Sequence, residues 1–351
     1  FGPGDDLSRC ALAKMVVGTQ NPVARDVEDT DDTDDTDDTD DTDDTDDTDE
    51  DVASDGTLTV EMGDEVDGGS VPKGATAVAM LNVDLTAAGE DIVVSEMIFS
   101  RSGVGSSSDF SNVYLYDGDD RLTTGRSVSS STNTVTFSAL SVDVLADETV
   151  TLTVVADFSS SAGAANTDAF EFLSADHLTH NGVDTDGDFP LEGEEYTISG
   201  SSSGTITIEK YGSLSNPTVS EQGSEIAKFK LSAANEDIWL NRIALRVRGS
   251  ISSSLVTNFV LYNGTTEVAT AAELNSNELM VFALDTPLEI EKGNDDTFTV
   301  TADIGAADAN DTIIVDLDEN TDLVAVGEVY GYGAQVTATS YDCNTTGAVT
   351  T

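Results

Sequence analysis

Most of this chain consists of one sequence that occurs twice. Three pairs of matching segments keep a constant separation of 146 residues: LTAAGEDIVV and LSAANEDIWL, beginning at Leu85 and Leu231, NVYLYDG and NFVLYNG, at Asn112 and Asn258, and TVVADF and TVTADI, at Thr153 and Thr299. A repeat of this length is long enough for each copy to bury its own core. We therefore expect two tandem domains with the same fold.

Each copy alternates between apolar and polar residues over short stretches, which is the pattern of half-buried β-strands. Asp-Gly, Asn-Gly and Ser-rich breaks separate these stretches, and no helical periodicity intervenes. The pattern predicts an all-β chain with two tandem Ig-like antiparallel β-sandwich domains, preceded by a short helical N-terminal segment and a polyacidic linker. The expected boundaries are a helical segment 1–25, an Asp/Thr-rich linker 26–55, sandwiches 56–200 and 201–340, and a tail 341–351.

The charge of the chain limits its partners. Asp and Glu number 68 against 14 Lys and Arg, for a formal net charge of −54. Nucleic acid and anionic membranes need clustered basic residues, so we expect neither as a partner. Such a charge attracts cations, and Ca²⁺ or a saline medium would reduce the self-repulsion. The alternative is that acidity only keeps a surface protein soluble.

An almost pure Thr-Asp-Asp repeat runs from Asp29 to Asp49 and cannot form an apolar core. One interpretation is a spacer extended by repulsion between its carboxylates. The other is an ordered array that binds Ca²⁺, because a period of three in an extended chain brings equivalent carboxylates to one edge. The residues concerned include Asp31, Asp32, Asp34, Asp35, Asp37 and Asp38.

The segment VDTDGDFPLEGEE carries the strongest calcium pattern in the two copies. Its carboxylates alternate around a glycine that would permit a tight turn: Asp184, Asp186, Asp188 and Glu192. A solvated turn between the domains is the other interpretation. A weaker calcium pattern lies in the hairpin YDGDD, at Asp117, Asp119 and Asp120. Because residues 191–203 are expected to connect the domains, calcium there would stiffen the junction.

Cysteines and sequons fit an exported protein. Cys10 and Cys343 are the two cysteines, and they would form one disulfide or remain two free thiols. Asn263, Asn310 and Asn344 begin N-x-T sequons, which are glycosylation candidates. No apolar run is long enough to insert into a membrane.

Catalytic patterns are missing from the sequence. The imidazoles are His177 and His180, and residues three apart in a strand face opposite sides. No G-x-S-x-G, P-loop or HExxH motif occurs. We therefore expect a protein that is not an enzyme, with Ca²⁺ as the one expected cofactor.

The N-terminal segment resembles the end of an S-layer homology motif, in which F-x-P is followed by T-R-A-E-(F/L)-A-x-(M/L)-(L/V). The matching residues are Phe1, Pro3, Ser8, Arg9, Ala13, Lys14, Met15 and Val16. The chain begins without an initiator Met, so we expect a trimmed product of a longer protein. The resemblance implies a cell-wall polymer as a partner, bound through a region upstream of Phe1.

The repeats resemble the tandem modules of S-layer and related surface proteins of candidate-phylum bacteria. The segments that carry this resemblance begin at Asp109 (DFSNVYLYDGDDRLTTGRSVSSSTNTVTF) and at Leu152 (LTVVADF). It implies an extracellular location at the cell surface and a homo-oligomer in a lattice or filament. The leading hypothesis is a structural subunit of such an assembly, and the alternative is an adhesin that binds carbohydrate or a partner surface.

Overall fold

The computed structural model describes residues 56–308, 310–338 and 342–348. Within these ranges the chain forms β-strands, turns and short 3-10 segments, and no α-helix. The expected all-β fold class is therefore confirmed. The expected N-terminal helix and the Asp/Thr tract lie outside the described residues. No helix of the described residues is long and apolar enough to cross a bilayer.

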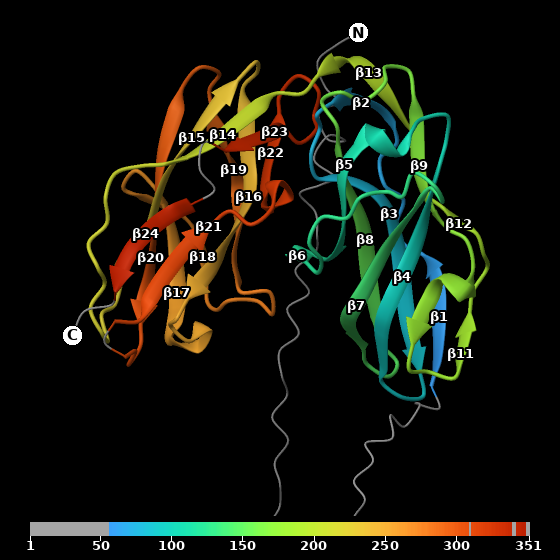
Figure 1. The fold of residues 1–351 in the computed structure, drawn as a ribbon, viewed down its shortest axis with the longest axis horizontal. Coiled ribbons are helices and arrows are strands. Elements are labelled where there is room, and N and C mark those ends of the chain that lie inside the picture. Colours follow the sequence, from blue (N-terminus) through green and yellow to red (C-terminus); the bar gives the residue numbers. More distant parts are fainter. Residues whose placement is uncertain (1–55, 309, 339–341, 349–351) are drawn as a thin grey trace, which may run out of the picture. The chain divides into compact units, whose positions relative to one another are not determined.

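The first sandwich consists of two facing sheets (Figure 1). One sheet has the order β11-β1-β3-β8-β5-β6; the other has the order β10-β4-β9-β13-β2, with β12 on β9 and β7 on β4. The strands are β1 (Thr57–Met62), β2 (Gly69–Lys73), β3 (Val78–Ala88), β4 (Ile92–Ser102), β5 (Phe110–Asp117), β6 (Asp120–Arg121), β7 (Thr134–Val144), β8 (Thr149–Phe158), β9 (Thr167–Phe172), β10 (Leu178–His180), β11 (Asp184–Asp186), β12 (Leu191–Glu192) and β13 (Tyr196–Ser202).

The second sandwich repeats this plan. Its sheets have the orders β18-β17-β20-β15-β14-β23 and β19-β16-β21-β24, with β22 on β16. Its elements are β14 (Thr205–Lys210), β15 (Ser224–Ala234), β16 (Ile238–Gly249), β17 (Val256–Asn263), β18 (Thr266–Ala271), β19 (Leu279–Ile290), β20 (Asp295–Ile304), β21 (Thr312–Asp316), the 3-10 segment η5 (Asn320–Asp322), β22 (Leu323–Gly327), β23 (Gln335–Ala338) and β24 (Asp342–Ala348).

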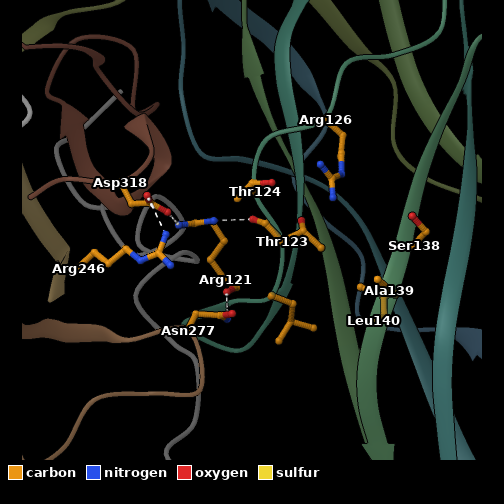
Figure 2. Close-up of a pocket in the computed structure, with 11 residues that line it drawn as sticks. Arg121, Thr123, Thr124, Arg126, Ser138, Ala139, Leu140, Arg246, Asn277 and Asp318 are labelled. Atoms are coloured by element: carbon orange, nitrogen blue, oxygen red, sulfur yellow. Dashed lines mark hydrogen bonds and ion pairs between the residues drawn. The ribbon is translucent and has the colours of Figure 1, made fainter. Parts of the chain in front are cut away.

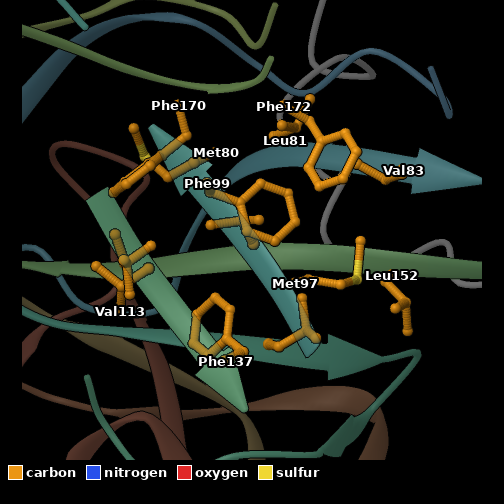
Figure 3. Close-up of a cluster of buried hydrophobic side chains, with 14 of the residues drawn as sticks. Met80, Leu81, Val83, Met97, Phe99, Val113, Phe137, Leu152, Phe170 and Phe172 are labelled. Atoms are coloured by element: carbon orange, nitrogen blue, oxygen red, sulfur yellow. The ribbon is translucent and has the colours of Figure 1, made fainter. Parts of the chain in front are cut away.

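Two separate hydrophobic cores result from the alternating pattern. Inward-facing residues of β3 and β15 are buried at the same positions along each strand. In the first core the rings of Phe99, Phe137 and Phe172 gather with Met97, as Figure 3 shows. Buried aromatic rings in edge-to-face and tilted contacts stabilise a core beyond the area they bury.

The strand registers match between the two copies. Tyr116 pairs with Arg121 across the β5–β6 hairpin, and Tyr262 pairs with Glu267 at the same place in the β17–β18 hairpin. A bulge before Glu96 in β4 has its counterpart before Arg242 in β16. Equivalent positions of the two sandwiches can therefore be compared residue by residue.

The expected connecting segment 191–203 is largely part of the first sandwich, which corrects the sequence prediction. β12 pairs with β9, and β13 pairs with β9 and, in parallel, with β2. The expected boundary at residue 200 thus falls within β13, and only Ser203 and Gly204 lie between β13 and β14. Because this link is short, the geometry of the junction depends on side-chain contacts between the sandwiches.

Candidate functional site: an arginine-rich contact between the two sandwiches

Arg121 is the centre of the contact between the sandwiches. It ends β6 in the first sandwich and is 3% exposed, whereas its partner Asp322, in η5 of the second, is 0% exposed. Nε donates to one Asp322 carboxylate oxygen at 2.8 Å, and Nη2 donates to the other at 3.0 Å. Nη2 also donates to Asp318 at 2.8 Å, and Nη1 donates to the Thr123 carbonyl at 2.6 Å. The two bonds between Arg121 and Asp322 form a bidentate arginine–carboxylate pair, which is the strong form of this interaction.

Arg242 of β16 makes a second buried contact with the first sandwich. One Nη donates to the Asp119 carbonyl at 2.7 Å, and the other donates to the Tyr116 hydroxyl at 3.2 Å. The guanidinium carbon lies 5.3 Å from the centre of the Tyr116 ring, which is within the range of a cation–π interaction. The Tyr116 hydroxyl in turn donates to the Thr321 hydroxyl at 3.1 Å. Every polar atom named here reaches across from one sandwich to the other.

The loop before β19 binds the β5–β6 hairpin through two side-chain amides. Asn277 donates to the Arg121 carbonyl at 2.7 Å, and Asn275 donates to the Asp120 carboxylate at 2.8 Å. The β5–β6 hairpin is therefore held by the second sandwich on its backbone as well as on its side chains.

A separate backbone contact joins the sandwiches at Thr76 and Gly333. The Thr76 amide donates to the Gly333 carbonyl at 3.0 Å, and the Thr76 hydroxyl donates to the Ala334 carbonyl at 2.7 Å. A Cβ on Gly333 would lie 2.1 Å from the Thr76 carbonyl oxygen, so only glycine allows this approach. Tyr196 and Tyr332 pack edge to face nearby, with ring centres 6.4 Å apart.

Burial and pairing change the proton affinities of these groups. Burial acts to lower the pKa of Arg121, but the hydrogen bonds and charge of Asp322 raise it overall. Burial acts to raise the pKa of Asp318, but the hydrogen bond from Arg121 leaves it below its usual value. Burial raises the pKa of Tyr116 to about 12, an effect that Arg242 partly offsets. The Arg121 guanidinium and the Asp318 carboxylate therefore stay charged at neutral pH.

A buried carboxyl group lies close to this contact. Asp157 accepts a hydrogen bond from the Ala77 amide at 2.9 Å and one from the Tyr114 hydroxyl at 3.2 Å. Burial raises the pKa of Asp157 to about 7, and the charges of Glu319 and Asp322 add to that effect. This group can therefore change its charge near neutral pH.

A recess of about 250 Å³ opens beside the buried pairs (Figure 2). It is lined by residues of both sandwiches: Arg121, Leu122, Thr123, Thr124, Arg126, Ser138, Ala139, Leu140, Arg246, Asn277 and Asp318. Arg246 donates to Asp318 at 3.2 Å. The lining thus contains three guanidinium groups and one carboxylate.

The weaker calcium pattern belongs to this contact. Asp117 and Asp120 face each other as a pair across the β5–β6 hairpin, and Asp119 supplies the carbonyl that Arg242 binds. Burial, with the charge of Asp120, raises the pKa of Asp117. The structure assigns this hairpin a role in joining the sandwiches; calcium binding by it stays a prediction.

The stronger calcium pattern adopts a different local structure from the expected turn. Asp184 and Asp186 lie in β11, which pairs in parallel with β1. In an extended strand, side chains two apart on one face are separated by about 6.8 Å, farther than two ligands of one Ca²⁺ ion. Asp188 follows β11 and Glu192 lies in β12, and both are exposed. Within the described ranges, no group of three or more His, Cys, Asp or Glu side chains could hold a metal ion. Calcium binding at this segment stays a prediction.

The remaining predicted residues lie apart from the contact. Asn263 donates to Asp296 at 3.1 Å, Asn310 is exposed at a turn after β20, and Asn344 lies in β24. Cys343 is buried in the second core, and Cys10 lies outside the described residues. Glycosylation and the disulfide stay predictions. So do the roles of Asp31, Asp32, Asp34, Asp35, Asp37 and Asp38, which also lie outside the described residues.

Sequence reasoning missed the arginines. Among the residues that the structure describes, four of the six arginines lie at this contact or line its recess: Arg121, Arg126, Arg242 and Arg246. A comparison of the two copies would have found two of them. Arg121 is equivalent to Glu267 in the second sandwich, and Arg242 is equivalent to Glu96 in the first. Such reversals of charge within a repeat mark surfaces that the two copies use differently.

Comparisons with known proteins give the following results. No family model matches the sequence, and no curated protein matches it. Solved structures that are similar include the C-terminal domain of the Streptococcus pyogenes antigen I/II-family protein AspA, with 11% identity, coverage of 81% of this chain and 98% of that one, and a TM-score of 0.21.

Two further structures are similar to the same extent. The C-terminal domain of the Streptococcus agalactiae antigen I/II polypeptide BspA has 13% identity, coverage of 77% of this chain and 97% of that one, and a TM-score of 0.17. The partial N-terminal region of an enterococcal surface protein has 10% identity, coverage of 82% and 94%, and a TM-score of 0.21. At these TM-scores the matches carry no argument about what the chain does.

Proposed function

We propose that this protein is a structural subunit of an extracellular surface assembly, an S-layer or a filament, that cations stabilise. The observation that carries the proposal is the buried pair between Arg121 and Asp322, which joins two sandwiches that have separate cores. Domains within one chain ordinarily move relative to each other unless their interface is extensive and well packed. A chain that fixes its two domains by buried ion pairs is suited to transmit force and keep a spacing.

Three contacts support this stiffness. They are the Arg121–Asp322 pair, the Arg242–Tyr116 contact and the backbone contact between Thr76 and Gly333. Bending at the two-residue link would separate all three, and each includes buried groups that would lose their partners. The junction therefore resists bending more strongly than a flexible linker does.

The proposal includes no catalytic activity. The contact concentrates arginines, and a guanidinium group stays protonated at physiological pH and so does not act as a general base. Arg121 uses its nitrogens for Asp322, Asp318 and the Thr123 carbonyl. These groups are suited to holding surfaces together.

Electron microscopy of the purified full chain tests the proposal. We expect ordered sheets or filaments in the presence of Ca²⁺, and fewer or none after chelation with EDTA. Dispersed monomers at high protein concentration in every condition, with Ca²⁺ and at high salt, would contradict it.

An adhesin is the second proposal, and one observation favours it. Val329 and Tyr330, in the loop between β22 and β23, are 63% and 41% exposed. Exposed apolar and aromatic side chains at a loop tip suit contact with a sugar ring or a protein surface. Binding to a glycan array or to cell-surface extracts tests this. Loss of such binding in Tyr330→Ser, with the assembly unchanged, would favour adhesion.

A further inference from the structure

Arg126 is the guanidinium group of the recess that is available to a ligand. Arg121 donates to Asp322 and Asp318, and Arg246 pairs with Asp318 and Glu278. Arg126 is exposed, and within the described residues no side chain forms an ion pair with it. Figure 2 shows its guanidinium facing the recess, apart from the pairs that join the sandwiches.

A second side chain of the recess also has unused capacity. The Nε atom of Arg246 is buried and has no hydrogen-bond partner within the described part of the chain. Such a donor costs free energy when it is left without a partner. The hydroxyls of Thr124 and Ser138 line the same recess and can donate hydrogen bonds as well. Together these groups form a set of hydrogen-bond donors in the lining of the recess.

The strand β7 forms one wall of the recess and offers backbone hydrogen-bonding groups to a ligand. β7 pairs with β4 on one side, and no described strand pairs with its other side. Ser138 and Ala139 lie where the ladder between β4 and β7 is interrupted by a bulge. A peptide lying along this wall would meet side-chain donors and an unpaired strand edge at the same place.

We propose that this recess binds an aspartate-rich peptide segment, namely the Asp/Thr tract Asp29–Asp49 of a neighbouring copy of this chain. The tract supplies carboxylates for Arg126 and hydroxyls for Thr124 and Ser138, so its composition complements the donors of the recess. Guanidinium and carboxylate groups form short, charge-assisted hydrogen bonds. In a chain whose net charge is −54, an exposed guanidinium with no ion-pair partner among the described residues is a specific place for such a segment.

The inference rests on the proposed function in one respect: the peptide comes from a neighbouring subunit, and an assembly brings the tracts of neighbouring subunits within reach. It names the contact that would join one subunit to the next. Peptide binding is measured on dispersed protein, so its success or failure is separate from the appearance of sheets or filaments.

Fluorescence anisotropy with a labelled Thr-Asp-Asp repeat peptide tests the inference. The protein is the full chain in which the aspartates of Asp29–Asp49 are replaced by asparagine, so that its own tract does not compete. We expect saturable binding that weakens as salt rises, because the contact is electrostatic. Arg126→Gln should weaken it at least about fivefold, as expected for loss of a charge-assisted hydrogen bond.

Lys292→Gln is the matched control, since it removes one positive charge at an exposed position outside the recess. We expect it to change the affinity by less than about twofold. Equal weakening by both substitutions would overturn the inference in favour of a diffuse charge effect. The absence of peptide binding would also overturn the inference. The same holds if the peptide does not bind while an oligogalacturonate binds in a way that depends on Arg126.

Discussion

The guanidinium of Arg121 and the carboxylate of Asp322, which are 201 residues apart in the sequence, form two hydrogen bonds of 2.8 and 3.0 Å with both side chains buried. Each residue belongs to a different sandwich with its own core. Removal of either partner leaves the other as a buried charge, which costs more free energy than the intact pair contributes. The coupling of the two sandwiches is therefore sensitive to a single substitution.

Arg121→Gln should destabilise the chain by about 3 to 5 kcal/mol, because Asp322 would stay buried without a counter-charge. Urea unfolding followed by fluorescence checks this. We also expect the transitions of the two sandwiches to separate in the variant. The control is Lys228→Gln, which breaks a part-exposed pair with Glu225 and should cost less than about 1 kcal/mol. Equal effects of the two substitutions would show that the buried pair does not couple the sandwiches.

Gly333→Ala should weaken the backbone contact between the sandwiches. The new Cβ would lie 2.1 Å from the Thr76 carbonyl oxygen, so the two segments must move apart. We expect a loss of about 1 to 3 kcal/mol, the usual range for overpacking. Gly200→Ala is the control, because a Cβ there has no neighbour within 4 Å. A Gly333→Ala chain with the melting temperature of the control would contradict the contact.

Asp157→Asn should change how stability depends on pH. The pKa of Asp157 is raised by burial to about 7, so the folded chain keeps a proton that the unfolded chain releases at lower pH. The stabilisation from this group is therefore full below about pH 4 and is lost as the pH rises through about 7. Asparagine cannot ionise, so the variant should gain stability relative to the parent chain over this range, by on the order of 2 to 4 kcal/mol.

Thermal unfolding from pH 4 to pH 8 measures that difference. Asp303→Asn is the matched control, because Asp303 is the repeat-equivalent residue, is part-exposed and accepts a backbone hydrogen bond from Gly223 as Asp157 does from Ala77. A difference between the Asp157 variant and the parent chain that does not change with pH would refute the assignment.

The fold was predictable where one face of a strand is buried, because alternation then appears directly in the sequence. β3 and β15 illustrate this, since every buried position in them except Ser224 is an apolar residue. The segment with β11, β12 and β13 was not predictable in the same way. Its Asp and Glu residues disfavour strands, and it becomes extended through pairing with β1, β9 and β2, which tertiary structure decides.

The contact between the sandwiches depends on how two separate domains meet, and a repeat pattern predicts only what the domains share. Tyr116 and Tyr262 occupy the same position in their hairpins, but their partners across the hairpin are Arg121 and Glu267. Local sequence gives no reason for arginine at one and glutamate at the other, because both suit an exposed hairpin. Arginine is explained at position 121 by its buried ion pair with Asp322 of the second sandwich.

The Asp/Thr tract from Asp29 to Asp49 gives the last prediction. Equivalent carboxylates recur at every third residue, and Ca²⁺ prefers several carboxylate oxygens. If the tract binds Ca²⁺ as an ordered array, the circular dichroism spectrum of the isolated peptide should change on addition of millimolar Ca²⁺ and return after EDTA. The same ionic strength of NaCl is the control, because screening of repulsion needs no specific ligand. A spectrum that Ca²⁺ leaves unchanged, or that NaCl changes equally, would identify the tract as a charged spacer whose length depends on ionic strength alone.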